Sequence, residues 1–285
     1  MKGFRPEGMT GHTERMSMGE RLAGKTAIVV GAGQTPGATI GNGRATAIRF
    51  AQEGAHVLLV DRDEASAEET RSMILEKDGR ADVFTADIAE AGAATTIAER
   101  GVEVLGRIDI LHNNVGIGMG DNTPTKLTEE VWDRVFDVNL KAMWLTCKHV
   151  VPIMREQKSG SIVCISSLAA TAAAGSITAY KISKAGVNAL VHSLAVTNAH
   201  HGIRVNGIMP GFIDTPMAVD AVSEALDIPR DQLAEFRDKL VPLNNRQGTA
   251  WDVANAALFL ASDEAAFITG ALLPVDGGQG TKIGA

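Results

Sequence analysis

The chain has 285 residues, of which 45% are hydrophobic and only 4% aromatic, so it can bury a sizeable core and is not globally disordered. Its 27 basic and 34 acidic residues give a net charge of −7 without any basic cluster, which argues against nucleic acid as the main partner. No apolar run is long enough for a membrane span, and the histidines show no metal-ligand spacing, so we expect neither a membrane nor a metal partner.

Residues 1–21 are polar and rich in Gly and Met, without the apolar segment of a secretory signal. We interpret them as an N-terminal arm that is flexible or contacts another subunit. No linker divides the remainder, so residues 22–285 are predicted to form one domain. Two cysteines, Cys147 and Cys164, lie in apolar runs, which predicts buried free thiols and a cytoplasmic location.

Short apolar runs alternate with helical patterns along the rest of the chain. The expected strands are 25–30, 55–60, 82–85, 108–111, 161–166, 204–208 and 271–275. The expected helices are 41–53, 64–77, 91–101, 129–157, 180–200 and 250–261. Strands that alternate with helices and are apolar throughout predict an α/β fold, a single-domain, Rossmann-like, doubly wound parallel sheet of about seven strands with helices on both faces.

A glycine-rich turn with Gly31, Gly33 and Gly41 follows the first predicted strand and precedes the first helix, as in dinucleotide-binding folds. Asp61 closes the second strand. A carboxylate there can bind the adenosine ribose and repel a 2′-phosphate, which favours NAD over NADP. The adjacent Arg62 could instead bind a 2′-phosphate, and a lone Asp often only caps a turn.

The order of separated motifs resembles the short-chain dehydrogenase/reductase family over about residues 22–280. The motifs are Gly31…Gly43, Asp61, Asp87, Asn113-Asn114-Val115-Gly116, Asn139, Ser166-Ser167, Tyr180-xxx-Lys184, Pro210-Gly211-Phe212-Ile213-Asp214-Thr215 and Val275-Asp276-Gly277-Gly278. The resemblance implies a nicotinamide cofactor and a homotetramer or homodimer. Val30 and Val115 depart from the family pattern, which usually has Thr and Ala there.

The glycine loop is longer than the family pattern, because nine residues, Ala32 to Ile40, separate Gly31 from Gly41. Such a loop is similar to that of enoyl-acyl-carrier-protein reductases, in which a Ser-Ile pair touches the cofactor; Thr39-Ile40 match this pair. The Tyr-xxx-Lys spacing differs from that of enoyl reductases, so carbonyl chemistry is favoured.

Tyr180 and Lys184 lie four residues apart at the start of a predicted helix and share one face. A free Tyr titrates near ~10 and must fall by about three units to act as a base near neutrality, which a neighbouring ammonium could cause. By resemblance, Ser167 binds the substrate oxygen and Asn139 holds a water in a proton relay to Lys184. Strand alternation predicts that Ser166 points away. Each residue alone also has a structural explanation, and their joint occurrence favours catalysis.

The resemblance and the positions in the predicted fold together suggest two sets of binding residues. The cofactor set is Gly31, Gly33, Gln34, Thr39, Ile40, Gly41, Asn42, Asp61, Arg62, Asp87, Ile88, Asn114, Val115, Gly116, Tyr180, Lys184, Pro210, Gly211, Ile213 and Thr215. The substrate set is Ser167, Ala169, Ile177, Phe212 and Met217, under a lid over about residues 216–245. Asp87 is equally plausible as the N-cap of the next helix. Cations are scarce here before Arg230, which predicts a modest, mainly apolar substrate.

The sequence therefore predicts an NAD-dependent oxidoreductase that interconverts a secondary alcohol and a ketone, with Tyr180 as general acid and base. A 3-oxoacyl thioester reductase is one alternative; it should prefer NADPH and present a basic docking patch, and neither is evident. The long loop alone suggests an enoyl reductase. A catalytically silent NAD-binding sensor is the remaining alternative, and the complete set of Ser167, Tyr180 and Lys184 argues against it.

Overall fold

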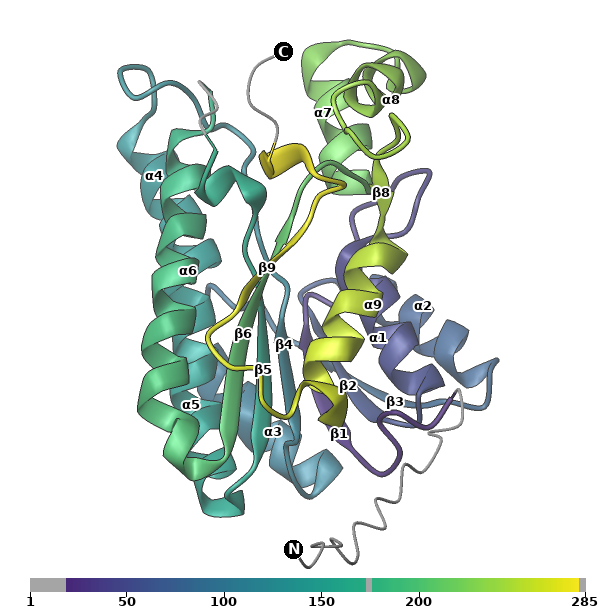
Figure 1. Ribbon diagram of the computed structural model, residues 1–285, viewed down its shortest axis with the longest axis vertical. Coiled ribbons are helices and arrows are strands. Elements are labelled where there is room, and N and C mark those ends of the chain that lie inside the picture. The colour runs from purple at the N-terminus through teal and green to yellow at the C-terminus, as the bar shows by residue number, and fades with distance from the viewer. Residues whose placement is uncertain (1–18, 173–175, 282–285) are drawn as a thin grey trace, which may run out of the picture.

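The computed structural model describes residues 19–172 and 176–281, and a seven-stranded parallel sheet lies at its centre (Figure 1). The strand order is β3-β2-β1-β4-β5-β6-β9. The strands are β1 Thr26–Val30, β2 His56–Asp61, β3 Arg80–Thr85, β4 Ile110–Asn113, β5 Gly160–Ile165, β6 Ile203–Pro210 and β9 Leu272–Val275. This arrangement confirms the predicted doubly wound fold class.

Helices cover both faces of the sheet (Figure 1). One face carries α1 Asn42–Gln52, α2 Glu64–Leu75 and α9 Ala250–Ala261. The other face carries α3 Ala93–Leu105, α5 Ala142–Gln157 and α6 Thr178–Asn198. None of the helices in the described part of the chain is both long and apolar enough to cross a bilayer.

The first strand shows why these apolar runs become central strands. Ala27 and Val29 join the core under α1 and α9, whereas Ile28 and Val30 join the core under α3 and α5. Successive side chains of a strand point to opposite faces, so a strand covered on both sides needs an unbroken apolar run. The two cysteines belong to the second core as buried free thiols, as predicted.

Small residues let α1 and α9 approach each other closely. Ala45 of α1 packs against Ala250 and Ala254 of α9, and all three are fully or almost fully buried. A helix contact built from alanines needs no aromatic side chains to fill the space between the axes. The low aromatic content of the chain is consistent with this kind of packing.

The helix predicted over 129–157 is interrupted by a π turn. It consists of α4 Glu129–Phe136, the π turn Asp137–Lys141 and α5. One extra residue in a turn is invisible to an apolar periodicity of 3.6, and π turns often occur at functional sites.

The alternative role of Asp87 as an N-cap is wrong, because α3 begins at Ala93 with Gly92 as its N-cap.

The predicted lid region contains elements that the sequence pattern did not reveal. A π turn over Pro216–Asp220 leads into α7 Ala221–Leu226 and α8 Arg230–Asp238. A two-stranded parallel pair, β7 Ile213–Asp214 and β8 Gly248–Thr249, brackets this segment. These elements are short and partly exposed, so neither length nor periodicity distinguishes them from loops.

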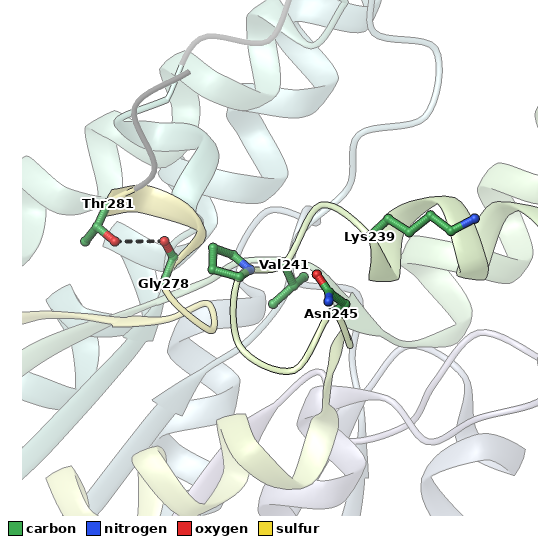
Figure 2. Close-up of a pocket in the computed structure, with 6 residues that line it drawn as sticks. Lys239, Val241, Asn245, Gly278 and Thr281 are labelled. Atoms are coloured by element: carbon green, nitrogen blue, oxygen red, sulfur yellow. Dashed lines mark hydrogen bonds between the residues drawn. The ribbon is translucent and has the colours of Figure 1, made fainter. Parts of the chain in front are cut away.

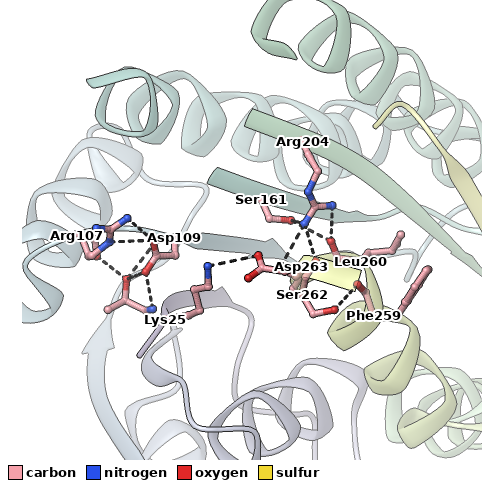
Figure 3. Close-up of polar contacts among 11 residues, drawn as sticks. Lys25, Arg107, Asp109, Ser161, Arg204, Phe259, Leu260, Ser262 and Asp263 are labelled. Atoms are coloured by element: carbon pink, nitrogen blue, oxygen red, sulfur yellow. Dashed lines mark hydrogen bonds and ion pairs between the residues drawn. The ribbon is translucent and has the colours of Figure 1, made fainter. Parts of the chain in front are cut away.

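Arg204 terminates α9 at the end of the sheet where the parallel strands begin (Figure 3). Its guanidinium donates hydrogen bonds to the carbonyl oxygens of Leu260 at 2.8 Å and Ser262 at 3.1 Å. The last carbonyls of a helix have no partner within the helix, so these bonds satisfy groups that would otherwise be buried unpaired. Burial lowers the pKa of Arg204, and Asp263 partly opposes this.

The start of the described chain is attached to the folded body. The carboxylate of Glu53 accepts hydrogen bonds from the backbone N–H groups of Gly19 and Arg21. The Arg21 guanidinium pairs with Glu264 at 2.7 Å. The last residues of the predicted N-terminal arm are therefore bonded to this body, while residues 1–18 lie outside the described part of the chain.

His112 of β4 is a buried titratable group in this core. Both ring nitrogens lack a hydrogen-bond partner among the described residues, and the ring meets Phe50 edge-on at 5.9 Å between centroids. Burial lowers the pKa of His112 from 6.5 to about 3. Below the ordinary value the unfolded chain therefore binds a proton that the folded chain excludes, and stability decreases as the pH falls toward 3.

We predict that His112→Leu weakens this acid sensitivity. Between about pH 7 and about pH 5 the wild type should lose about 2 kcal/mol more unfolding free energy than the variant, since one pKa unit corresponds to about 1.4 kcal/mol. Urea unfolding of both proteins at the two pH values measures the difference. Replacement of the exposed His192 by Asn provides the control. Equal losses in wild type and His112→Leu would contradict the prediction.

Candidate active site

The candidate site lies where the connections of the sheet change direction, between β1 and β4. Gly31 follows β1, and Asn114 follows β4. The Asn114 side chain donates a hydrogen bond from Nδ2 to the Gly31 carbonyl oxygen at 3.2 Å. Open parallel sheets bind ligands in the crevice at such a switch point, outside the carboxyl ends of the strands.

Two glycines form a close-packed cradle at this point. Gly31 has a φ of +82°, and a Cβ added at Gly43 would lie only 1.8 Å from the Gly31 carbonyl oxygen. The first turn of α1 contains no acidic residue, so its free N–H groups and positive dipole end are not neutralised there. Asn42 Oδ1 is buried there without a partner in the described chain. The two glycines and the free N–H groups fit the pyrophosphate of a dinucleotide, whereas Asn42 Oδ1 is an acceptor and needs a donor.

The extended glycine loop, Gln34 to Ile40, is folded by its own side chains. Gln34 Oε1 accepts a hydrogen bond from Gly41 N at 2.9 Å, and Gln34 Nε2 donates to the Thr39 carbonyl oxygen at 3.3 Å. Ser66 of α2 holds the other end, where its Oγ accepts from Gln34 N at 2.8 Å. Ile40 packs onto the alanines of α1 and α9. The loop is thus an ordered part of the site.

Asp61 lies next to this loop at the end of β2. Its Oδ2 accepts a hydrogen bond from Gly33 N at 2.8 Å, and its Oδ1 accepts one from Asp63 N at 3.1 Å. Each carboxylate oxygen keeps a lone pair for a further donor. Arg62 is exposed, whereas Arg44 is buried and paired with Glu69 at 2.6 Å. The Asp61 side chain therefore both caps a turn and offers acceptors toward the crevice.

Asp87, Ile88 and Asn113, which follow or end β3 and β4, have ordinary structural contacts. Asp87 Oδ1 accepts a hydrogen bond from Ala89 N at 2.9 Å, which closes the turn after β3. Ile88 is buried in the core beside β2 and β4. Asn113 is also buried, and its Oδ1 accepts a hydrogen bond from Thr146 Oγ1 at 2.9 Å. These contacts fix the strand ends that border the crevice.

Ser167, Tyr180 and Lys184 come together at the carboxyl end of β5. Ser167 Oγ accepts a hydrogen bond from Ala169 N at 3.1 Å. Burial raises the pKa of Tyr180, and the neighbouring Ser167 side chain partly opposes this rise. Ser166 Oγ donates to the Lys184 carbonyl oxygen at 3.0 Å, on the side predicted by strand alternation. The two neighbouring serines therefore contact different parts of α6.

Lys184 is 2% exposed, and its Nζ donates a hydrogen bond to the Ile165 carbonyl oxygen at 2.9 Å. The ammonium lies 5.8 Å from the centre of the Tyr180 ring. Burial lowers the pKa of Lys184 to about 8 and raises the pKa of Tyr180. The pKa of Tyr180 is therefore raised by burial, and the lowering by Lys184 that the sequence predicted is not found among the protein groups.

The segment after β4 runs directly over this pair. A Cβ at Gly116 would lie 3.0 Å from Lys184 Nζ, and one at Gly118 would lie 3.3 Å from the Tyr180 ring. Asn139, buried in the π turn, accepts from Ile117 N at 2.7 Å and donates to the Ile117 carbonyl oxygen at 2.9 Å. Its side chain thus clamps the segment over the site. The water relay predicted for Asn139 stays a prediction.

Asp121 is a site residue that the sequence analysis missed. Its Oδ2 accepts a hydrogen bond from Tyr180 N at 2.7 Å, and its Oδ1 accepts one from Ala179 N at 3.1 Å. The residue at the N-cap position of α6, Ile177, has no capping side chain, so the cap comes from a segment far away in the sequence. No local spacing signals such a cap.

The motif from Pro210 to Thr215, part of the predicted cofactor set, lies between the sheet and the C-terminal segment. A Cβ at Gly211 would lie 2.6 Å from Asp276 Cβ, and Phe212 N donates a hydrogen bond to Gln279 Oε1 at 3.0 Å. Pro210 ends β6. The side chains of Ile213 and Thr215 are buried, so a cofactor bound there would contact mainly their backbone atoms.

The predicted substrate residues lie at the same end of the sheet but differ in exposure. Ala169, Ile177 and Phe212 are half-buried, whereas Met217 is exposed. The Arg237 guanidinium of α8 stacks 4.3 Å from the centre of the Phe212 ring. Burial lowers the pKa of Arg237 to about 10. One cation therefore lies behind an otherwise apolar wall.

A hollow of about 290 Å³ separates the end of the lid from the C-terminal segment (Figure 2). Val241 and Asn245 line one side, and Gly278 and Thr281 line the other. The same C-terminal segment reaches the catalytic side, because a Cβ at Gly280 would lie 2.7 Å from Leu168 Cδ1. Within the described residues no cluster of three His, Cys, Asp or Glu side chains forms a candidate metal site.

Comparison with known proteins gives concordant matches along the chain. A family model described as enoyl-(acyl carrier protein) reductase matches residues 37–279. The 3-oxoacyl-[acyl-carrier-protein] reductase FabG of Thermotoga maritima is 38% identical over 261 residues, 90% of this chain and 98% of that protein. The levodione reductase of Leifsonia aquatica is 34% identical and covers 91% of this chain and 95% of its own length.

A solved structure extends the likeness to three dimensions. The crystal structure of carveol dehydrogenase from Mycobacterium avium in complex with NAD has a TM-score of 0.85 and 33% sequence identity. The similarity covers 92% of this chain and 100% of that chain.

We predict that Asp121→Ala loosens the start of α6. Loss of a capping carboxylate costs about 1–2 kcal/mol of unfolding free energy, and the amides of Ala179 and Tyr180 should exchange with solvent faster than in the wild type. Chemical unfolding and hydrogen–deuterium exchange measure the two effects. Asp137→Ala is a matched control, because Asp137 pairs only with the exposed Lys141 at 2.9 Å. Unchanged exchange at these two amides would contradict the capping role.

Proposed function

Because the chain belongs to the short-chain dehydrogenase/reductase family and is an oxidoreductase that acts on alcohols or ketones, we propose that it interconverts a secondary alcohol and a ketone with NAD. The supporting observation is the group formed by Ser167, Tyr180 and Lys184, in which Ser167 follows β5 and the buried Lys184 ammonium lies 5.8 Å from the centre of the Tyr180 ring. We treat residues 22–285 as the catalytic unit, with a lid over about residues 216–245.

Tyr180 acts as the proton-transfer group in this proposal. During oxidation its phenolate oxygen takes the proton of the substrate hydroxyl, and during reduction the phenol returns it to the carbonyl oxygen. Ser167 donates a hydrogen bond to the same substrate oxygen. When bound, the nicotinamide ring accepts or supplies the hydride at the carbinol carbon.

Lys184 makes the tyrosine usable as a base in this proposal. Burial lowers the pKa of the lysine and raises that of the tyrosine, so each single charge is disfavoured in the pocket. A phenolate beside an ammonium reduces both penalties, because the opposite charges compensate each other. Proton loss from Tyr180 is thus coupled to a charged Lys184.

NAD rather than NADP is proposed on the charges around the end of β2. The Asp61 carboxylate lies where the ribose of the adenosine would bind and would repel a 2′-phosphate. The buried Arg44 is engaged with Glu69 and with the Ser66 carbonyl oxygen, which it reaches at 3.0 Å. Among the described residues around this strand end, the exposed Arg62 is the remaining candidate for a phosphate.

The substrate is proposed to be a modest, mainly apolar small molecule. The residues expected to line its site are predominantly aliphatic or aromatic, and Arg237 is occupied by Phe212 and by Gln247, whose Oε1 it reaches at 2.6 Å. Relatives of similar identity are named levodione reductase and (-)-trans-carveol dehydrogenase, and the corresponding substrates are reasonable first compounds for a screen.

A 3-oxoacyl thioester reductase is a second candidate, because the FabG protein of Thermotoga maritima is 38% identical to this chain. Reduction of acetoacetyl-coenzyme A with NADPH tests it directly. Faster turnover of this thioester with NADPH than of any free ketone with NADH would favour the second candidate over the first.

A homotetramer or homodimer is proposed from exposed apolar side chains on the outer helices. Trp144 of α5 and Ile182 and Val196 of α6 are 44%, 42% and 79% exposed. Neighbouring helices with large exposed apolar residues often pair with a second copy.

A cytoplasmic location is proposed on the two free buried thiols.

We predict that Tyr180→Phe reduces kcat by about 10²–10⁴-fold, the contribution expected of a general acid and base. The dissociation constant for NAD should stay within about threefold, since the phenol hydroxyl is not the main cofactor anchor. NADH absorbance with a panel of secondary alcohols and calorimetric titration with NAD measure the two quantities. Unchanged turnover with unchanged NAD affinity would refute the mechanism, and lack of turnover in the wild type despite NAD binding would favour a sensor.

We predict that Asp61→Asn shifts the preference for NAD over NADP by about 10–100-fold toward NADP, because it removes a charge-assisted hydrogen bond and a like-charge repulsion. The ratio of kcat/KM for the two cofactors measures the shift. Glu64→Gln, which removes an exposed negative charge from the first turn of α2, is the control. A preference that stays unchanged would show that Asp61 does not read the ribose.

A further inference from the structure

The extended glycine loop contacts the lid, although the two segments are far apart in the sequence. Ala38 N donates a hydrogen bond to Asp220 Oδ1 at 3.0 Å, and Thr39 Oγ1 lies 3.4 Å from Asp214 Oδ1. In Figure 1 the violet-blue loop that follows β1 extends toward the segment between β8 and α8. The residues that lengthen this loop are thus the ones that meet the lid.

Gly37 shows that the contact is close. A Cβ at this position would lie 2.7 Å from Pro216 Cβ and 2.9 Å from Asp220 Cγ. The φ of Gly37 is not in the left-handed region, so an alanine is permitted by the backbone and is disfavoured only by the lid. The loop backbone therefore packs directly on the first turn of the lid.

Arg230 adds a third element to the same contact. Its Nη2 lies 2.5 Å from Asp214 Oδ1, and its Nε lies 3.2 Å from Asp220 Oδ1. The three side chains are 20–27% exposed, so their bonds are partly shielded from water. Arg230 begins α8, Asp220 ends the π turn and Asp214 lies in β7. One ion cluster thus connects the loop, the lid turn and the lid helix.

The other end of the loop belongs to the phosphate cradle. Gln34 binds Gly41 N and the Thr39 carbonyl oxygen, and Gly41 is the N-cap of α1. A ligand that holds the cradle in place therefore also holds in place the backbone that donates to Asp220. Two groups that bind the same ordered segment strengthen each other's binding, and the effect is reciprocal.

We propose that Asp220 is a positioning residue that fastens the lid to the glycine loop, so that a dinucleotide on the cradle holds the lid over the substrate. The proposal rests on the proposed function, because it assumes that the cradle binds NAD and that the lid covers the substrate. It assigns a role to the lengthened loop, whose extra residues make the contacts with Asp214 and Asp220.

Hydrogen–deuterium exchange of the α7 and α8 amides, with and without saturating NAD, tests the coupling without requiring turnover. In the wild type NAD should slow this exchange by roughly tenfold, within the usual range of coupling between sites. In Asp220→Ala and in Gly37→Ala most of this protection should disappear. Glu224→Gln, on the exposed surface of α7, should retain it.

Steady-state kinetics supply the second measurement. Both loop–lid variants should raise KM for the substrate roughly tenfold and change kcat much less, since Ser167, Tyr180 and Lys184 are untouched. Full NAD protection of the lid in both variants, or none in the wild type, would overturn the proposal. If Asp220→Ala does not fold, Gly37→Ala decides. Tyr180→Phe should keep the NAD protection, so loss of the proposed chemistry and loss of the coupling are separately visible.

Discussion

The burial of the Lys184 ammonium at the end of β5 is the constraint on which the site depends. A charge that is 2% exposed needs partners, and the protein supplies one carbonyl oxygen, that of Ile165, at 2.9 Å. This one hydrogen bond does not fully replace the water that the ammonium loses on burial, so the pKa of Lys184 is lowered to about 8. Groups that can become negative beside it are therefore favoured, and the phenol of Tyr180 is the group that the fold places there.

The segment between β4 and α4 fixes the positions of Lys184 and Tyr180. Its glycines lie against Lys184 and Tyr180, Asn139 clamps its middle from the π turn, and Asp121 caps the helix that carries Tyr180 and Lys184. Each contact uses a backbone group as one partner, so the geometry depends little on side-chain rotamers. Preorganisation of this kind is what proton transfer between positioned groups needs.

The lengthened glycine loop shows how extra residues can be accommodated at the crevice of a parallel sheet. Its backbone groups are satisfied by Gln34, Ser66 and Asp220 rather than by water alone, so the extra residues form an ordered bridge. Lengthening a loop costs little chain entropy, because the cost of bringing its ends together grows only slowly with its length. Here the ends remain at β1 and α1, and the middle of the loop packs on the lid.

The sequence by itself determined the layers of the fold and predicted the members of the proposed catalytic group. Unbroken apolar strands such as β1, and the spacing of Ser167, Tyr180 and Lys184 on one βα unit, are local patterns that depend on the periodicities of strands and helices. Only the tertiary structure decided that Asp121 caps α6, that a π turn holds Asn139, and that Asp220 meets the loop. Those contacts join segments distant in the chain, and long-range hydrogen bonds leave no periodic signal in the residues that make them.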